Sequence, residues 1–128
     1  MKIHIIDDNE DITTMLAKYM TIKGHNCSVS NNGRNGLNMI MSNQYDVILL
    51  DLAMPEFSGM DVVDALVRNS MIQKLNIVAL TASSVSPEKE EILKKSGVLS
   101  ILKKPIDPDD LLDYLFQFDK KSGNGKSP

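Results

Sequence analysis

Residues 45–59 read YDVILLDLAMPEFSG, and this stretch decides the fold. Its apolar run at 47–50 stops at Asp51, and Pro55 and Gly59 then interrupt regular structure. A short run that is apolar on both faces is typical of a central strand in a parallel sheet covered by helices. Ligands of such sheets bind beyond the carboxyl ends of the strands, so Asp51 lies where a functional residue is expected. The alternative is an aspartate that only caps the following turn.

Strand and helix patterns alternate on both sides of this stretch. After the first strand, apolar residues recur at the helical spacing of 12, 15, 16, 19 and 20, and Gly24 ends the pattern. The predicted strands are Lys2–Ile6, Asn26–Ser30, 47–50, 76–80 and 98–102. The predicted helices lie at about 12–24, Gly33–Ser42, 60–67, 86–97 and 107–118. Right-handed crossovers place helices on both faces of a parallel sheet, so the pattern predicts a doubly wound α/β fold with five strands and five helices.

Length and composition predict one soluble domain. The chain has 128 residues, of which 42% are hydrophobic and 24% charged, within the range of ordinary globular proteins. We expect a domain at 1–119 and a flexible tail or linker stub at 120–128, which is rich in Gly and Ser. The net charge of −3 argues against direct binding to nucleic acid.

The single cysteine and the lack of long apolar runs argue against a disulfide-bonded protein and against a membrane-spanning protein. Cys27 has no partner for an internal disulfide and is interpreted as a small buried hydrophobe. No apolar run approaches the ~18 residues of a membrane span, and no signal peptide precedes the first strand. These absences lead us to expect a cytoplasmic protein that does not contact a membrane.

Polar residues follow four of the five predicted strands. Asp7 and Asp8 follow the first, Asp51 the third, Thr81 the fourth and Lys104 the fifth. The topology brings all these strand ends to one edge of the sheet. Three carboxylates in one place repel each other unless a cation offsets their charge, and a few hard oxygen ligands suit Mg²⁺.

This grouping suggests phosphoryl transfer to a carboxylate. Asp51, the central acid, would be the nucleophile, while Mg²⁺ and Lys104 stabilise the transferring group and Thr81 hydrogen-bonds one of its oxygens. Each residue also has a simpler interpretation. The two acids could start a helix, Thr81 is common at strand ends, and Lys104 could be a solvated loop residue. His4 is interpreted as a packed residue of the first strand rather than a ligand.

Short motifs at four places in the chain together resemble the receiver domain of two-component response regulators. They are Asp7-Asp8, Asp51 with Met54-Pro55 and Gly59, Thr81-Ala82, and Lys104-Pro105. The resemblance covers about residues 2–118 and implies a flavodoxin-like fold with strand order 2-1-3-4-5.

The resemblance also implies a function. Asp51 would accept a phosphoryl group from a sensor histidine kinase or a histidine phosphotransfer protein. Asp8 and Asp51 would bind Mg²⁺ directly with the backbone carbonyl of Ala53, and Asp7 would act through water. Phosphorylation would draw Thr81 inward and reshape the surface of the fourth helix, fifth strand and fifth helix, which controls an output partner. Such a domain is not an enzyme, although it assists its own phosphorylation and dephosphorylation.

Three positions depart from common receiver patterns. Ile101 stands where many receivers carry an aromatic residue, so we expect the signal to travel through backbone and helix movement. Ala53 and Ser83, two residues after Asp51 and Thr81, occupy positions that tune the lifetime of the phosphoryl group in the family. Both are small, and neither offers a carboxylate or amide to position an attacking water. We therefore expect a long-lived phosphoryl group.

Other functions remain open at this point. An aspartate-nucleophile phosphatase needs a second acid two residues after its nucleophile, and that position is Ala53. A flavin-binding module would place a phosphate after the first strand, where Asp7 and Asp8 repel it. A phosphorylation-independent interaction module on the receiver fold is the third alternative.

The last helix suggests an interaction surface. Its apolar residues populate more than one stripe, which predicts partner binding or homodimerisation through this helix. They are Leu111, Leu112, Leu115, Phe116 and Phe118. The chain could be a stand-alone shuttle or part of a longer regulator.

Overall fold

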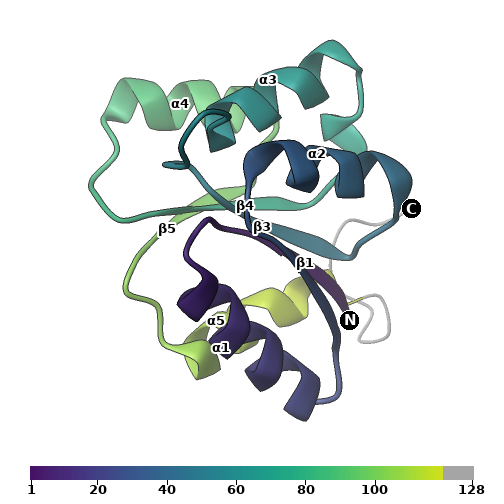
Figure 1. Cartoon of the computed structure of the whole chain (residues 1–128). Helices are drawn as coiled ribbons and strands as arrows, with labels where there is room; N and C mark the ends of the chain where they lie inside the picture. Colours follow the sequence, from purple (N-terminus) through teal and green to yellow (C-terminus); the bar gives the residue numbers. More distant parts are fainter. Residues whose placement is uncertain (120–128) are drawn as a thin grey trace.

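A five-stranded parallel sheet forms the centre of the computed structural model, which describes residues 1–119 (Figure 1). The tail expected at 120–128 lies outside the described residues. The strand order is β2-β1-β3-β4-β5, as the family resemblance implied. The strands are β1 (Lys2–Ile6), β2 (Asn26–Ser30), β3 (Val47–Asp51), β4 (Ile77–Thr81) and β5 (Ser100–Lys103).

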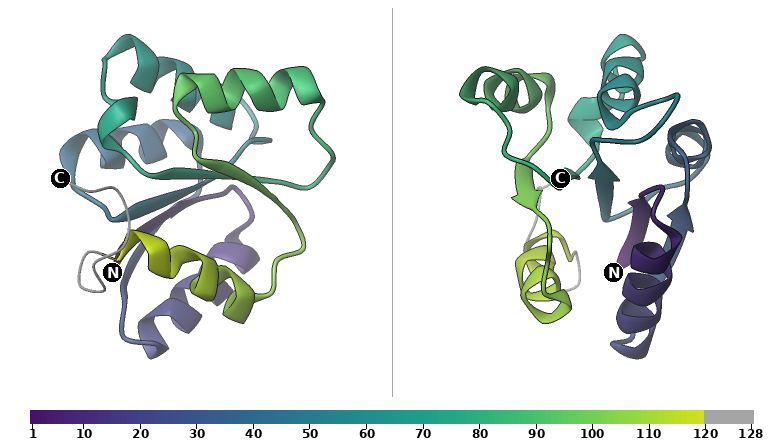
Figure 2. Two further views of the ribbon diagram at one scale, coloured as in Figure 1. Left: turned by 180° about the vertical axis from the view of Figure 1, so that it is seen from behind. Right: turned by 60° about the vertical axis from the view of Figure 1, so that its left-hand side comes forward.

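Helices cover both faces of this sheet. The α-helices are α1 (Glu10–Ile22), α2 (Gly33–Ser42), α3 (Gly59–Arg68), α4 (Pro87–Ser96) and α5 (Pro108–Leu115), with short 3₁₀ turns η1 (Ile72–Lys74) and η2 (Phe116–Phe118). Helices α2, α3 and α4 lie on one face, and α1 and α5 lie on the other (Figures 1 and 2). The doubly wound fold predicted from the sequence is therefore confirmed.

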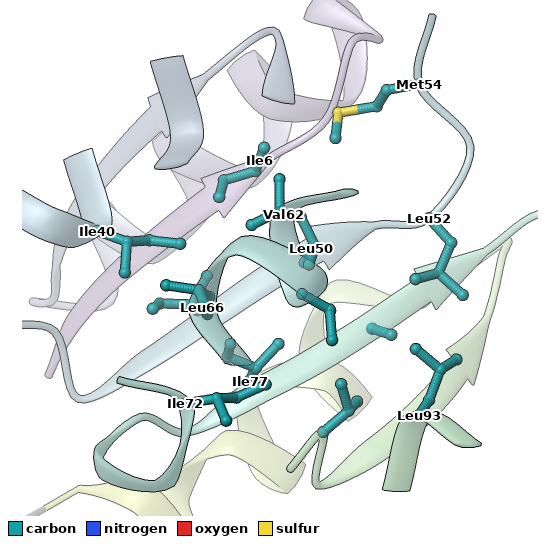
Figure 3. Packing of buried hydrophobic residues seen from close by; sticks show 14 residues of the cluster. Ile6, Ile40, Leu50, Leu52, Met54, Val62, Leu66, Ile72, Ile77 and Leu93 are labelled. Carbon is teal, nitrogen blue, oxygen red and sulfur yellow. The ribbon is translucent and has the colours of Figure 1, made fainter. Parts of the chain in front are cut away.

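Two apolar cores fill the space between the sheet and its helices. On the α2-α3-α4 face, Val62 and Leu66 of α3 pack over Ile6, Leu50 and Ile77 of three adjacent strands (Figure 3). The other core is built mainly from β1, β3, β4, α1 and α5. Strands β3 and β4 are buried along their whole length, which explains why their sequences are continuous apolar runs.

Local capping signals fix where the helices begin. The side chains of Asn9, Asn32, Ser58, Ser86 and Asp107 each accept a hydrogen bond from a backbone amide in the first turn of α1, α2, α3, α4 and α5. Such caps satisfy amides that have no partner inside the helix. The cap predicted at Ser86 is thus confirmed.

The ends of two elements differ from the sequence-based expectation. The fifth strand begins at Ser100 rather than 98, because the amide of Val98 donates to the carbonyl of Leu93 (3.0 Å) and so completes the end of α4. The last helix gives way to η2 at Phe116 instead of continuing as an α-helix to 118.

The expected excess of apolar residues on the last helix is wrong for four of the five residues. Four of them are at most 6% exposed and belong to the core on the face covered by α1 and α5, namely Leu111, Leu112, Leu115 and Phe118. Phe116 is 40% exposed. Leu111, Leu112 and Leu115 all lie on the buried face of α5 itself. The 3₁₀ turn changes the direction of the side chains after Leu115, so a helical projection through residue 118 places Phe118 incorrectly. This argument for a dimer therefore no longer holds.

Cys27 is half-buried and packs against the core on the α1-α5 face. Burial raises the pKa of its thiol to about 11. Its interpretation as a small apolar residue agrees with this position, although its burial is incomplete.

Candidate functional site

The carboxyl ends of neighbouring strands bring three predicted site acids together. Asp7 directly follows β1, and Asp51 is the last residue of the adjacent β3. One carboxylate oxygen from each of Asp7, Asp8 and Asp51 lies within 4.8 Å of the others. Asp7 is fully buried and Asp51 is 4% exposed, whereas Asp8 is exposed to solvent.

Lys104 contacts the two buried acids from the other side of the site. Its Nζ lies 2.5 Å from Oδ2 of Asp7 and 3.7 Å from Oδ1 of Asp51. The backbone positions this lysine, because the amide of Lys104 donates to the carbonyl of Thr81 (2.7 Å). Lys104 therefore lies with the acids rather than in solvent.

Among residues 1–119, the charges of the site are not balanced, since Lys104 is the one cation with an ion pair to its acids. Burial raises the pKa of Asp51 to about 6, and the neighbouring Asp7 carboxylate adds to the rise, while Lys104 and the Ala53 amide oppose it. One ammonium group thus faces three carboxylates. An oxygen-rich, acidic site of this kind fits Mg²⁺, which prefers hard ligands and retains several waters.

Ala53 and Thr81 lie beside the acids in different ways. The Ala53 amide donates to Oδ1 of Asp51 (3.3 Å), and Ala53 itself is exposed. The Thr81 hydroxyl donates to the carbonyl of Ser83 (2.9 Å) and accepts from its amide (3.3 Å). The hydroxyl is therefore bonded to its own loop. Ile101 is half-buried against the core on the α4 face.

Gly59 allows α3 to begin against the backbone of Asp51. A Cβ atom at position 59 would lie 2.4 Å from the Asp51 carbonyl oxygen and 2.7 Å from Cα of Leu52. The Gly59 amide donates to the Leu52 carbonyl (3.1 Å). In the sequence, Gly59 is only a breaker and part of a motif; the close approach in the structure shows why no side chain fits there.

Two asparagines that sequence reasoning missed hold Asp7 in place. The backbone amide of Asn9 donates to Oδ1 of Asp7 (2.9 Å). Asn31 Nδ2 donates to the Asp7 carbonyl and to the Thr13 hydroxyl, both at 2.9 Å. An asparagine after a strand indicates only a turn in the sequence, so no local signal identified these contacts.

An apolar groove of about 400 Å³ lies next to the site, between α1 and the segment after β5. Met15, Ile106 and Lys104 are among the residues that line it. Met15 is 45% exposed. Among residues 1–119, no helix has both the length and the apolarity needed to cross a bilayer.

Comparison with known proteins identifies the class of domain that this fold and site define. A family model described as the response regulator receiver domain matches residues 3–116. The chain therefore belongs to the response regulator receiver domain family, whose members serve two-component signalling.

Individual relatives agree with this assignment. The chain is 31% identical over 115 residues to the sensor histidine kinase RcsC of Salmonella typhi, covering 90% of this chain and 12% of that protein. The structure resembles chemotaxis protein CheY4 of Vibrio cholerae with a TM-score of 0.81 and 30% identity, covering 92% of this chain and 98% of the other. Response regulator TrrA of Thermotoga maritima, solved in complex with Mg²⁺-BeF, gives a TM-score of 0.76 at 25% identity, with coverage of 93% and 100%. The chain spans about half or less of the length of the curated relatives that it matches.

Proposed function

We propose that residues 1–119 are a receiver domain in which Asp51 accepts a phosphoryl group from phosphohistidine on a sensor histidine kinase or a histidine phosphotransfer protein. The observation that carries this proposal is the position of Asp51, a nearly buried carboxylate between two other acids and 3.7 Å from the Lys104 ammonium. The TrrA structure with Mg²⁺-BeF supports the same type of site in a relative.

In the proposed reaction, a carboxylate oxygen of Asp51 attacks phosphorus. A P–O bond forms while the P–N bond of phosphohistidine breaks, and the imidazole leaves with the electron pair of that bond. Lys104 stabilises negative charge on the phosphoryl oxygens, since charge in this transition state is spread over them. Asp7 holds the Lys104 ammonium beside the reacting carboxylate.

The acid cluster would hold Mg²⁺ through Asp8, Asp51 and the Ala53 carbonyl, with Asp7 acting through water. When bound, the metal supplies positive charge that offsets the added phosphoryl oxygens. Asp8 is exposed, which leaves one side of the cluster open to solvent and to the incoming phosphoryl group.

Signalling would follow from a change in the partner of Thr81. Its hydroxyl now bonds to Ser83, and a phosphoryl oxygen on Asp51 would compete for the donor. Movement of Thr81 would displace the loop before α4 and reshape the α4-β5-α5 surface for an output partner or a second copy of the chain. Ala53 and Ser83 offer no side-chain carboxylate or amide to position an attacking water, which favours a long-lived phosphoryl group.

The wider role follows from the same proposal. The domain would act as a phosphoacceptor rather than as an enzyme with its own substrate, in the cytoplasm, without direct contact with nucleic acid or membrane.

Intact-mass and Phos-tag analysis after incubation with acetyl phosphate tests this function. We expect one Mg²⁺-dependent phosphoryl adduct on the wild type and on Asp64→Asn, an exposed control on α3, and none on Asp51→Asn. A folded wild type that forms no adduct would contradict the proposal and favour a phosphorylation-independent interaction module.

A further inference from the structure

The segment that joins β2 to α2 contacts both loops expected to carry metal ligands. It comprises the connecting residues Asn31 and Asn32 together with Gly33 and Arg34, the first two residues of α2, and we call it the 31–34 segment. None of the proposed phosphoacceptor or metal-binding residues belongs to it. Its contacts reach the Asp7-Asp8 loop on one side and the loop at 52–58 on the other.

Contacts on the first side hold the chain at Asp7. The Asp7 amide donates to the carbonyl of Ser30 (3.1 Å), and Asn31 Nδ2 donates to the Asp7 carbonyl (2.9 Å). The same amide group of Asn31 also donates to Thr13, which is 1% exposed. The backbone of Asp7, which precedes Asp8, is thus held at its amide by Ser30 and at its carbonyl by Asn31 of the 31–34 segment.

Contacts on the second side hold the loop that carries Ala53. The ends of this loop are fixed by hydrogen bonds from Leu52 to Leu80 (2.9 Å) and from Gly59 to Leu52 (3.1 Å). Between these ends, Phe57 extends toward α2, where the Arg34 guanidinium lies 4.6 Å from the centre of its ring.

Gly33 lets the 31–34 segment approach this loop closely. A Cβ atom at position 33 would lie 2.2 Å from the Phe57 carbonyl oxygen. The neighbouring Glu56 has φ of 66°, a conformation that residues other than glycine rarely adopt. A strained backbone of this kind persists only when its surroundings hold it, and the Phe57 contacts with Gly33 and Arg34 supply that support.

We infer that the 31–34 segment sets the distance between the two loops and so positions the Asp8 carboxylate and the Ala53 carbonyl for the metal. This inference rests on the proposed Mg²⁺-dependent function. Asn31 and Arg34 are positioning residues, since they act through Asp7 and Phe57. Outer-shell partners of this kind commonly influence metal affinity without touching the ion.

Two measurements on the full chain test the inference. Hydrogen exchange followed by mass spectrometry, without metal, reports the order of each loop, and calorimetric titration with Mg²⁺ reports affinity. The variants are Arg34→Ala, Phe57→Leu and Asn31→Ala. Arg68→Ala is the matched control because it removes an exposed arginine from the C-terminal end of α3, the end away from the loop at 52–58. Phe57→Tyr is a second control because it retains the aromatic ring.

We expect each variant to act on one loop. Arg34→Ala and Phe57→Leu should raise exchange at 52–58, and Asn31→Ala should raise it at 7–12. Loss of an exposed cation–π contact predicts Mg²⁺ binding weaker by about 3-fold in Arg34→Ala, with Phe57→Tyr and Arg68→Ala close to the wild type.

Other results would overturn the inference. Unchanged exchange in the two loops, or an increase spread over the whole chain, would show that the segment does not order these loops. Local loosening without weaker Mg²⁺ binding would show that it does not position the ligands. A wild type that binds no Mg²⁺ would contradict the proposed function itself, and the inference about the ligands would fail with it.

Discussion

The buried His4 predicts a loss of stability as the pH falls. His4 is fully buried in β1, where Nδ1 lies 2.7 Å from the Ser28 hydroxyl and Nε2 lies 2.8 Å from the Ser30 hydroxyl. Its ring stacks on Tyr45 with 4.8 Å between ring centres. The sequence interpretation of His4 as a packed residue is therefore confirmed. Burial lowers the pKa of His4 from 6.5 to about 4.

The sign and size of the effect follow from this shift. Between the two pKa values the unfolded chain binds a proton that the folded chain does not, so lower pH favours unfolding. The stabilisation is complete above the unfolded pKa and is lost as the pH falls toward the folded pKa. The shift predicts a loss of about 2 kcal/mol between about pH 7 and about pH 5, and of about 3 kcal/mol by about pH 4.

Urea denaturation of the wild type and His4→Gln across this pH range measures the effect. Carboxylates titrate in both proteins and cancel in the difference between their unfolding free energies. We expect that difference to fall by about 2 kcal/mol from about pH 7 to about pH 5. His25→Gln is the control, since His25 is only half-buried and should give a smaller change. A difference that stays constant with pH would refute the reasoning.

Three further predictions concern the acid site. The raised pKa of Asp51 means that its contribution to stability is present below the unfolded pKa of 3.8 and is lost as the pH rises through about 6. Asp51→Asn should therefore stabilise the metal-free chain at neutral pH by up to about 3 kcal/mol, with a smaller gain below about pH 4 in urea denaturation; equal stability at neutral pH would contradict this. Lys104→Ala should lower the free energy of unfolding by about 3 kcal/mol, because it leaves the fully buried Asp7 carboxylate without its cation. An unchanged midpoint of urea denaturation would show that another group compensates the charge of Asp7. Gly59→Ala should cost about 2 kcal/mol, since the new Cβ would lie 2.4 Å from the Asp51 carbonyl, and a thermal midpoint equal to that of the wild type would count against the close approach.

The sequence predicted the fold and the gathering of the acids because both depend on local patterns and on one topological rule. Apolar runs ending at Asp7, Asp51 and Thr81 mark the strand ends, and parallel topology places these ends on one edge. Lys104 joins them because its strand pairs with β4. No tertiary distance was needed for any of these predictions.

The parts that could not be predicted depend on contacts between loops. The contact between Arg34 and Phe57 depends on how the start of α2 lies relative to the loop at 52–58. A helical projection does not show that the 3₁₀ turn η2 directs Phe118 into the core. The direction of the Thr81 hydroxyl depends on the loop at Ser83. The local sequence does not predict such contacts, since each is set by packing between segments that lie far apart in the chain.

The position of Lys104 explains why a second cation suits this site. Its ammonium lies 2.5 Å from Asp7 but 3.7 Å from Asp51, so the lysine mainly compensates the acid that has no access to solvent. Asp51 is left with less compensation, and burial together with Asp7 raises its pKa to about 6. A carboxylate nucleophile must be ionised to attack phosphorus, and a divalent cation beside Asp8 and Asp51 would lower that pKa again. In the proposed reaction, the buried Asp7–Lys104 pair would hold the lysine near the Asp51 carboxylate. A bound metal would extend the pH range in which Asp51 is ionised to values below about 6.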